Sequence, residues 1–249
     1  MTLKNKVVVI MGASSGIGEA TANLLAKSGA KLTIAARRMN RLEKIVQNNV
    51  GAEILPVAAD VSKADEVQNV IDKTVEKYGR VDVMFNNAGI MPVNNLDAIA
   101  RDEWQNIMDI NIKGVLNGIA AVLPVMKKQQ SGHIITTSSV LGYEVLPGYA
   151  AYSGSKYAVR AIMEGLRQEE RTNNIKTTVI APGTVQTELF NSINNQEIKE
   201  QLESLKNLPG ADMQALQPEE IAEAVAFVIN TPKNMAVNEM VIRPTGQEV

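Results

Sequence analysis

The run Val7-Val-Val-Ile-Met11 leads directly into Gly12-Ala-Ser-Ser-Gly16-Ile-Gly18, and a helical pattern follows. A strand, a glycine-rich turn and a helix in this order open a βαβ unit. Glycines permit the tight turn and let the backbone approach a pyrophosphate, while the helix N-terminus presents unpaired N–H groups and the positive end of its dipole. The stretch therefore predicts a dinucleotide site instead of a plain turn. The residues expected around it are Gly12, Ser14, Ser15, Gly16, Ile17 and Gly18.

Short β-branched runs alternate with helical patterns along the rest of the chain. Strands are expected at 6–11, 31–36, 53–58, 81–85, 133–137, 176–180 and 236–242, and helices at 17–28, 40–49, 63–78, 102–129, 150–173 and 218–230. Strands that are apolar throughout suit a parallel sheet covered on both faces, and the alternation indicates a doubly wound α/β sheet. Since no linker-like composition divides the chain, residues 1–249 are expected to form a single domain.

The composition excludes several classes of function. The 249 residues carry 25 Lys and Arg against 27 Asp and Glu, a balance that favours neither nucleic acid nor an anionic membrane as a partner. The chain has no cysteine and a single histidine, His133, so no metal site is expected. The N-terminal apolar run is too short for a signal peptide, and no stretch approaches the roughly 20 apolar residues of a membrane span. A cytoplasmic protein is expected.

The end of the second expected strand indicates which nicotinamide cofactor binds. An acidic residue at this place accepts hydrogen bonds from the ribose 2′-OH of NAD, but the sequence has Ala36 followed by Arg37 and Arg38. Guanidinium groups bind a 2′-phosphate through charge-assisted hydrogen bonds. Arg37 is the first candidate for that contact, Arg38 is expected to stack on adenine or share the charge, and Ser14 can add a hydroxyl donor. The sequence therefore predicts NADP(H), with solvated helix-start charges as the alternative for the arginines.

A tyrosine and a lysine at helical spacing are the candidate catalytic pair. Tyr152 and Lys156 are four residues apart and share one face of the expected helix. At roughly 4 Å and an effective dielectric of about 20, their attraction is of order 4 kcal/mol, which would lower the pKa of the phenol toward the range of a general acid or base. Ser139 ends the fifth expected strand, where doubly wound sheets place ligands, and can hold the substrate oxygen. Ser138 is the nearest competitor for that role.

Together these motifs resemble the short-chain dehydrogenase/reductase family over essentially the whole chain. The matching pieces are, in family order, Gly12-x-x-x-Gly16-x-Gly18, Asp60-Val61, Asn86-Asn-Ala-Gly89, Asn111, Ser139, Tyr152-x-x-x-Lys156 and Pro182-Gly183. The chain looks most like the NADP(H)-preferring branch of 3-hydroxy acid, serine-type and clavulanate-type dehydrogenases. One departure is Met11, where the family usually has threonine, and we expect it to reduce the rigidity of the turn more than cofactor binding.

The resemblance implies a Rossmann domain with strand order 3-2-1-4-5-6-7 and helices on both faces. It implies that Tyr152 is the general acid in reduction and the base in oxidation, and that Lys156 lowers the tyrosine pKa and holds the nicotinamide ribose. Ser139 would orient the carbonyl, and Asn111 would anchor a water that relays protons. The further cofactor contacts that it implies are Asp60 and Val61 at adenine, Asn86, Asn87, Ala88 and Gly89 near the ribose, and Pro182, Gly183, Thr184 and Thr187 at the nicotinamide end.

The resemblance also concerns the substrate pocket and the assembly. Residues 184–217 form a long excursion between the last two strands, interpreted as a substrate-binding lid, with a surface loop carrying a short helix as the alternative. A mostly apolar pocket is expected from Met91, Leu141, Tyr143 and Leu189. Helices 102–129 and 150–173 and the C-terminal end are expected to build a homotetramer, with a dimer as the alternative.

The expected activity is hydride transfer between NADP(H) and a carbonyl or secondary alcohol of a small or medium substrate. Two alternatives remain at this point: a 3-oxoacyl-carrier-protein reductase and a non-catalytic NADP(H)-sensing regulator. A sensor has no need of a tuned phenol, so the presence of Ser139, Tyr152 and Lys156 together argues for an enzyme. The physiological substrate, the preferred direction and the stereochemistry stay open.

Overall fold

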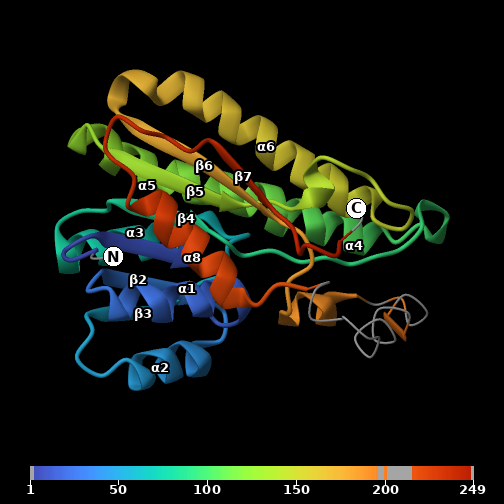
Figure 1. Cartoon of the computed structure of the whole chain (residues 1–249), viewed down its shortest axis with the longest axis horizontal. Helices are drawn as coiled ribbons and strands as arrows, with labels where there is room; N and C mark the ends of the chain where they lie inside the picture. The colour runs from blue at the N-terminus through green and yellow to red at the C-terminus, as the bar shows by residue number, and fades with distance from the viewer. Residues whose placement is uncertain (1–2, 194, 196–198, 201–214, 248–249) are drawn as a thin grey trace.

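The computed structural model describes residues 3–193, 195, 199–200 and 215–247. Seven parallel strands form one sheet in the order β3-β2-β1-β4-β5-β6-β7, so the predicted topology is confirmed (Figure 1). The strands are β1 (Val7–Met11), β2 (Lys31–Ala36), β3 (Ile54–Ala58), β4 (Val83–Asn86), β5 (Gly132–Thr137), β6 (Ile175–Pro182) and β7 (Glu239–Ile242). The helices are α1 (Gly16–Lys27), α2 (Met39–Asn48), α3 (Ala64–Tyr78), α4 (Arg101–Ile107), α5 (Gly114–Gln129), α6 (Ala150–Glu170) and α8 (Pro218–Ile229).

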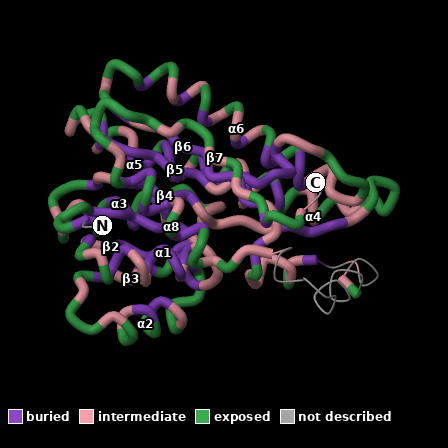
Figure 2. Tube along the Cα trace, viewed as in Figure 1, coloured by how far each residue is buried: buried purple, intermediate pink, exposed green. Residues whose placement is uncertain are grey.

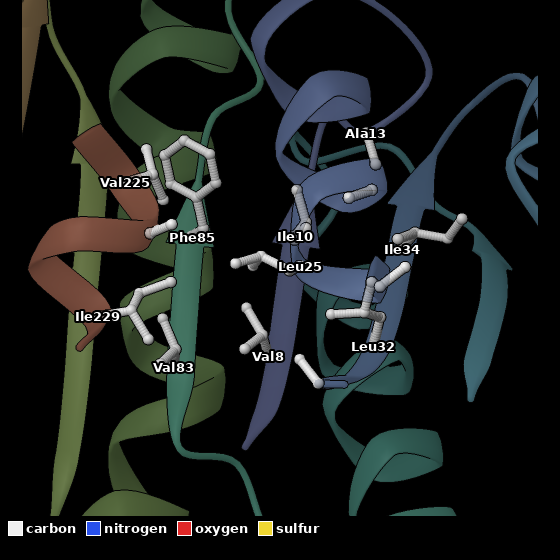
Figure 3. Packing of buried hydrophobic residues seen from close by; sticks show 14 of the residues in the cluster. Val8, Ile10, Ala13, Leu25, Leu32, Ile34, Val83, Phe85, Val225 and Ile229 are labelled. Atoms are coloured by element: carbon white, nitrogen blue, oxygen red, sulfur yellow. The ribbon is translucent and has the colours of Figure 1, made fainter. Parts of the chain in front are cut away.

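The sheet is covered on both faces because successive residues of each strand point to opposite sides. On one face, Val8 and Ile10 of β1 belong to a cluster with Leu25 of α1, and α2 and α8 complete this layer. Figure 3 shows Val225 and Ile229 of α8 facing Phe85 and Val83 of β4. The buried residues follow the strands, while the outer sides of α2 and α6 are largely exposed (Figure 2).

The opposite face of the sheet carries the second layer of helices. Val9 and Met11, the alternate residues of β1, belong to a cluster with Val70 of α3, Val122 of α5 and Met163 of α6. All of these side chains are almost completely buried. Burial on both faces explains why the strands are apolar throughout, as expected for a parallel sheet.

The single helix expected at 102–129 is divided in the structure. Helix α4 ends at Ile107, a π-helical turn covers Met108–Lys113, and α5 begins at Gly114. Such turns often lie at functional sites, and this one carries the buried Asn111.

The continuous stretch Arg101–Gln129 is long and apolar enough to cross a membrane by length and composition, a feature that the sequence-based search for apolar runs missed. Within the described part of the chain it is the one helix of this kind, and 44 % of its most apolar window is buried inside the protein. Val115, Val122 and Met126 pack into the core beside the sheet. Part of its apolar character therefore serves packing against the sheet.

The last part of the sheet differs in detail from the expectation. The seventh strand begins at Glu239 instead of residue 236, and the carbonyl oxygen of Val237 before it accepts a hydrogen bond from the Thr178 hydroxyl at 2.6 Å. After β6, a short helical turn covers Glu188–Ser192, and Val185 forms an isolated parallel bridge with Leu216. Much of the expected lid, namely residues 194, 196–198 and 201–214, lies outside the described residues.

Candidate active site

A cavity of about 650 Å³ lies at the carboxyl ends of the strands. Its wall includes every cofactor residue expected from the sequence except Gly18 and Asn86 and, of the expected catalytic residues, Ser139, Tyr152 and Lys156. Gly18 and Asn111 lie next to lining residues without lining the cavity themselves: Gly18 packs against Gly12, and Asn111 is hydrogen-bonded to Ile90. The parallel topology explains the convergence, since the turns after β1, β4, β5 and β6 all emerge at the same edge of the sheet.

The glycine-rich turn packs too closely against its surroundings for side chains. Gly12 has a φ of +81°, and a Cβ added to it would lie 2.6 Å from the Cα of Ala88. A Cβ on Gly18 would collide with the carbonyl oxygen of Gly12, so Gly18 allows α1 to begin directly beneath the turn. Asn87 fixes this arrangement, because its Nδ2 donates to the Gly12 carbonyl at 3.1 Å and its Oδ1 accepts from the Thr137 hydroxyl at 3.0 Å.

Arg38 is the arginine that contacts the glycine-rich turn. Its Nη2 donates to the hydroxyl oxygens of Ser14 at 2.9 Å and Ser15 at 3.1 Å. The Nη1 of Arg38 donates to Glu188 Oε2 at 2.9 Å, and Arg41 Nη1 donates to Glu188 Oε1 at 2.5 Å. These arginines with Ser14 therefore form a cationic cluster beyond the end of β2.

Arg37 and Asp60 line the same end of the cavity. Burial raises the pKa of the Asp60 carboxyl, but hydrogen bonds from the backbone and hydroxyl of Ser62 and the positive charges of Arg37 and Lys63 outweigh it, and the net pKa is lowered. Asp60 therefore remains a carboxylate, with its Oδ1 accepting from the Ser62 hydroxyl at 2.8 Å. Ala36, at the place of the acidic residue of NAD-binding sheets, is buried and also lines the cavity.

The phenol of Tyr152 is buried at the wall of the cavity. The Ser139 side chain adjoins the phenol, and its Oγ accepts from the backbone N–H of Leu141 at 3.1 Å. Burial raises the pKa of Tyr152 to about 12, the Ser139 hydroxyl acts in the opposite direction, and Tyr149 raises it further. The expected lowering of this pKa is therefore wrong for the free protein, because burial of the phenol is the dominant influence.

Lys156 lies one helical turn beyond Tyr152 and points past it. Its Nζ donates to the carbonyl oxygen of Thr137 at 2.9 Å and lies 5.6 Å from the centroid of the Tyr152 ring. Only 5 % of the residue is exposed, and burial lowers its pKa to about 8. A lysine with this pKa can exchange a proton close to neutral pH, which suits a proton-transfer site.

Asn111 joins the loop after β4 to α6 behind the cavity. Its Oδ1 accepts from the backbone N–H of Ile90 at 2.9 Å, and its Nδ2 donates to the Ile90 carbonyl at 2.9 Å and to Ser155 Oγ at 3.1 Å. The side chain lies close to Lys156, since a Cβ built on Gly89 would be 3.4 Å from Asn111 Oδ1 and 3.7 Å from Lys156 Nζ. Asn111 therefore stabilises the loop and helix around the cavity and does not line the cavity itself.

The end of the cavity beyond Tyr152 and Ser139 is mainly apolar. Met91, Leu141 and Leu189 line it as expected, and they belong to one cluster with the Tyr152 ring and Phe190. Tyr143 does not line the cavity. Its ring packs 3.5 Å from the Arg160 guanidinium and its hydroxyl donates to Glu239 at 2.8 Å, because Tyr143 follows the short turn after Ser139 and faces β7.

Charge is unevenly distributed along the cavity. Among the described lining residues, the charged ones are Arg37, Arg38, Asp60, Glu188 and Lys156. Arg37 and Arg38 follow β2, Asp60 follows β3, and Glu188 pairs with Arg38, so these four gather at one end. Lys156 is the charge nearest the Tyr152 phenol in this set, so the described wall at the apolar end is otherwise neutral.

Gln247, Ser192 and Glu188 are among the lining residues that were not singled out from the sequence. Gln247 lies near Gly183 and accepts a hydrogen bond from the backbone N–H of Thr184 at 2.9 Å. Ser192 accepts from the backbone N–H of Met91 at 2.8 Å and so ties the segment after β6 to the loop after β4. Glu188 is adjacent to the expected Thr187, which was the only local indication for it.

The single histidine lies away from the cavity. His133 is in the first half of β5, where its Nε2 is 2.8 Å from the Thr178 hydroxyl, while the cavity adjoins the other end of the strand. In the described part of the chain, no group of three or more His, Asp or Glu side chains is arranged to hold a metal ion. Thr184 and Thr187, expected at the nicotinamide end, both line the cavity.

Known proteins resemble this chain over nearly its full length. The short chain dehydrogenase family profile matches residues 6–198. An uncharacterised oxidoreductase of Staphylococcus saprophyticus is 51 % identical over 251 residues, which is 99 % of each protein. Among solved structures, an alcohol dehydrogenase from the archaeon Thermococcus sibiricus complexed with 5-hydroxy-NADP has a TM-score of 0.87 and 32 % identity, with 99 % of both chains covered.

A second solved structure, the closed form of a serine dehydrogenase complexed with NADP⁺, has a TM-score of 0.90 at 26 % identity and covers 98 % of this chain and 96 % of that one. The profile match covers most of the chain, and the staphylococcal relative matches it from end to end. The protein is therefore an oxidoreductase of the short-chain dehydrogenase/reductase family.

Proposed function

We propose that this protein is an NADP(H)-dependent enzyme that transfers a hydride to or from the carbonyl or alcohol carbon of an uncharged, mainly apolar substrate. The observation that carries the proposal is the adjoining pair Tyr152 and Ser139 at the wall of a cavity that is cationic at one end and apolar at the other. Lys156, behind this pair, is a buried cation suited to proton exchange near neutral pH.

The residues of the cavity fit a dinucleotide with a 2′-phosphate. The close approach of Gly12 to Ala88 leaves bare backbone at the turn, which suits a pyrophosphate. Ala36 removes the carboxylate that would repel a 2′-phosphate, and Ser14 and Arg38 provide donors beside it. A neighbour from Burkholderia phymatum is complexed with NAD. These local charges, and not family membership, therefore support a preference for NADP(H).

The bound nicotinamide supplies or accepts the hydride at the substrate carbon. In reduction, the Tyr152 hydroxyl donates its proton to the substrate oxygen as the carbonyl becomes an alcohol, and Ser139 holds that oxygen in place. The raised pKa of Tyr152 keeps the phenol protonated at neutral pH, which is the form that reduction requires. Lys156 returns a proton to the phenolate. Asn111 holds the loop after β4 against helix α6 near Lys156 through its hydrogen bonds to Ile90 and Ser155. In oxidation the same proton moves in the reverse direction.

The wall of the cavity supports an uncharged substrate. The side chains opposite Tyr152 include Met91, Leu141, Leu189 and Phe190, which would pack against hydrocarbon. A substrate carboxylate would lie against these apolar groups with little compensation, and burying an unpaired charge is costly. The beginning of the 184–217 segment supplies part of this wall, in keeping with its interpretation as a substrate-binding loop.

A matched pair of substrates tests the proposal. Ethyl acetoacetate and acetoacetate carry the same ketone, but only the second has a carboxylate. We expect kcat/KM with NADPH, followed by loss of absorbance, to be at least about tenfold higher for the ester. If acetoacetate is the better substrate, the proposed substrate class is wrong. If the Tyr152→Phe variant reduces either compound at the wild-type rate, the proposed chemistry is wrong.

We also propose that the enzyme is a cytoplasmic homotetramer, with a dimer as the alternative. Leu116 of α5, Tyr157 of α6 and Val241 of β7 are large apolar side chains that remain at least 39 % exposed in the single chain. They lie on the elements that the sequence indicated for subunit contacts. Sedimentation velocity at micromolar concentration tests the assembly, and a monomer would contradict it.

A further inference from the structure

Glu188 occupies the centre of the cationic cluster at the end of β2. Its Oε2 accepts from Arg38 Nη1 at 2.9 Å and its Oε1 accepts from Arg41 Nη1 at 2.5 Å. The same Arg38 guanidinium holds the Ser14 hydroxyl through Nε at 3.2 Å and Nη2 at 2.9 Å. The carboxylate comes from a segment about 150 residues away, at the first position of the turn Glu188–Ser192.

This arrangement has the chemistry of an anion site with an anion already bound. Two guanidinium groups and a neighbouring hydroxyl are the donors that recognise a phosphate, and a carboxylate satisfies the same geometry. Hydrogen bonds from Arg41 and then Arg38 lower the pKa of Glu188, so the carboxylate is ionised at neutral pH. A 2′-phosphate beside the carboxylate would repel it, and both anions require the same Nη groups.

We propose that Glu188 is an internal competitor for the 2′-phosphate and that NADP(H) displaces its carboxylate from Arg38 and Arg41. The inference rests on the proposed NADP(H) dependence and adds a residue that weakens the preference for NADP(H). NAD(H) has a hydroxyl in place of the phosphate and leaves both ion pairs intact. Glu188 therefore reduces the preference for NADP(H) over NAD(H) that Arg38 and Arg41 would otherwise give.

The position of Glu188 links the cofactor to the substrate wall. Leu189 and Phe190 follow it directly and line the apolar end of the cavity, and Ser192 holds Met91 at the end of the same turn. Release of Glu188 removes the ion pairs with Arg38 and Arg41 at the beginning of this turn, while the Thr187 cap and the Ser192 contact remain. Binding of NADP(H) therefore changes how firmly this turn is held by Arg38 and Arg41, and binding of NAD(H) does not.

Two small ligands isolate the phosphate contact from the rest of the cofactor. 2′,5′-ADP carries the 2′-phosphate, and adenosine 5′-phosphate is the same molecule without it. Calorimetric titration of the wild type, Glu188→Gln and Glu53→Gln gives the dissociation constants independently of turnover. Glu53 is the matched control, because it is an exposed glutamate paired with Lys31 at 3.3 Å at the start of β2.

We expect Glu188→Gln to bind 2′,5′-ADP at least about threefold more tightly than the wild type, since the binding-competent fraction of the site rises. Binding of adenosine 5′-phosphate should change by less than about twofold, and Glu53→Gln should change neither constant by more than that. Because the ion pairs are partly exposed, the gain should shrink at high salt. Unchanged or weaker 2′,5′-ADP binding by Glu188→Gln overturns the inference.

A second variant separates this inference from the proposed function. If Arg38→Ala weakens 2′,5′-ADP binding while Glu188→Gln fails to strengthen it, the NADP(H) preference stands and the competition is refuted. If neither substitution alters binding, the phosphate subsite itself has been misplaced and both proposals fail. Thermal unfolding of each variant without ligand checks that the fold is intact.

Discussion

The Nζ atom of Lys156 lies 5.6 Å from the centroid of the Tyr152 ring, one turn further along α6. Both side chains are almost fully buried, and burial acts on them in opposite directions. It raises the pKa of the phenol to about 12 and lowers that of the ammonium to about 8. Because burial favours the neutral form of each group, the free protein holds a protonated phenol beside a lysine that releases its proton readily.

Removal of the Tyr152 hydroxyl should abolish turnover and leave cofactor binding intact. We expect Tyr152→Phe to lower kcat by a factor of about 10³ or more, since the proton donor is lost. Fluorescence titration should give an NADPH dissociation constant within about threefold of the wild type. Tyr157→Phe is the control, because Tyr157 lies on the same helix with 39 % exposure. Comparable loss of activity in both variants would refute the role of Tyr152.

The two adjacent serines should differ in their effect on catalysis. The Ser139 side chain adjoins the Tyr152 phenol at the cavity wall, whereas the Ser138 hydroxyl donates to the carbonyl oxygen of Lys156 at 3.2 Å. Ser139→Ala should reduce kcat/KM by about 10²-fold, a typical effect of removing a hydrogen bond that stabilises the transition state. Ser138→Ala should act mainly on stability, which thermal unfolding would detect. The opposite ranking of the two kcat/KM values would assign the substrate oxygen to Ser138.

Cofactor preference should depend more on Arg38 than on Arg37. Arg38 contacts Ser14 and Ser15, while the described effect of Arg37 is on the charge of Asp60. We expect Arg38→Ala to lower kcat/KM for NADPH by about tenfold or more relative to NADH, which corresponds to about 1.4 kcal/mol. Arg37→Ala should have a smaller effect on this ratio. A larger effect of Arg37→Ala would show that the guanidinium groups exchange roles when the cofactor binds.

The single histidine, His133, should make the free energy of unfolding depend on pH in the acid range. Burial, followed by the charges of Lys176 and Lys6, lowers the pKa of His133 from 6.5 to about 3. Between pH 6.5 and about 3, His133 is therefore protonated in the unfolded chain and neutral in the folded chain. The free energy of unfolding falls as the pH falls through this range.

Proton NMR should show that the His133 ring does not titrate between about pH 8 and pH 5. Between about pH 6.5 and pH 4, the wild type should lose roughly 3 kcal/mol of unfolding free energy that His133→Gln retains. Urea unfolding at several pH values measures this difference. A ring that titrates near 6.5, or equal acid sensitivity of the two proteins, would contradict the buried neutral histidine.

Local patterns in the sequence were sufficient for the architecture. The alternation of apolar strands and helices predicted the parallel sheet, since burial on both faces requires strands without polar positions. The glycine-rich turn after β1 predicted the place of the cleft, because the backbone there must approach a ligand and its neighbours closely. Spacing along one helix was enough to bring Tyr152 and Lys156 to the same side of α6.

Tertiary structure decided which partners those residues meet. Glu188 reaches Arg38 and Arg41 across about 150 positions of the chain, and Gln247 reaches Thr184 from the far end. Neither contact leaves a periodic or local signal, because it depends on how loops fold back over the sheet. Tyr143 points toward Arg160 instead of the cavity for the same reason.

The protonation of the site was likewise a property of the folded protein. A Tyr–Lys spacing of four residues indicates an attraction, but the pKa also depends on how much water the surrounding chain removes. The sequence by itself determined the sheet and the glycine-rich turn, and it nominated the candidate reacting groups, because all of these follow from short-range pattern and residue chemistry. Only the tertiary structure determined the burial of Tyr152 and Lys156 and the pairing of Glu188, because solvent exclusion and long-range contacts exist only after the chain has packed.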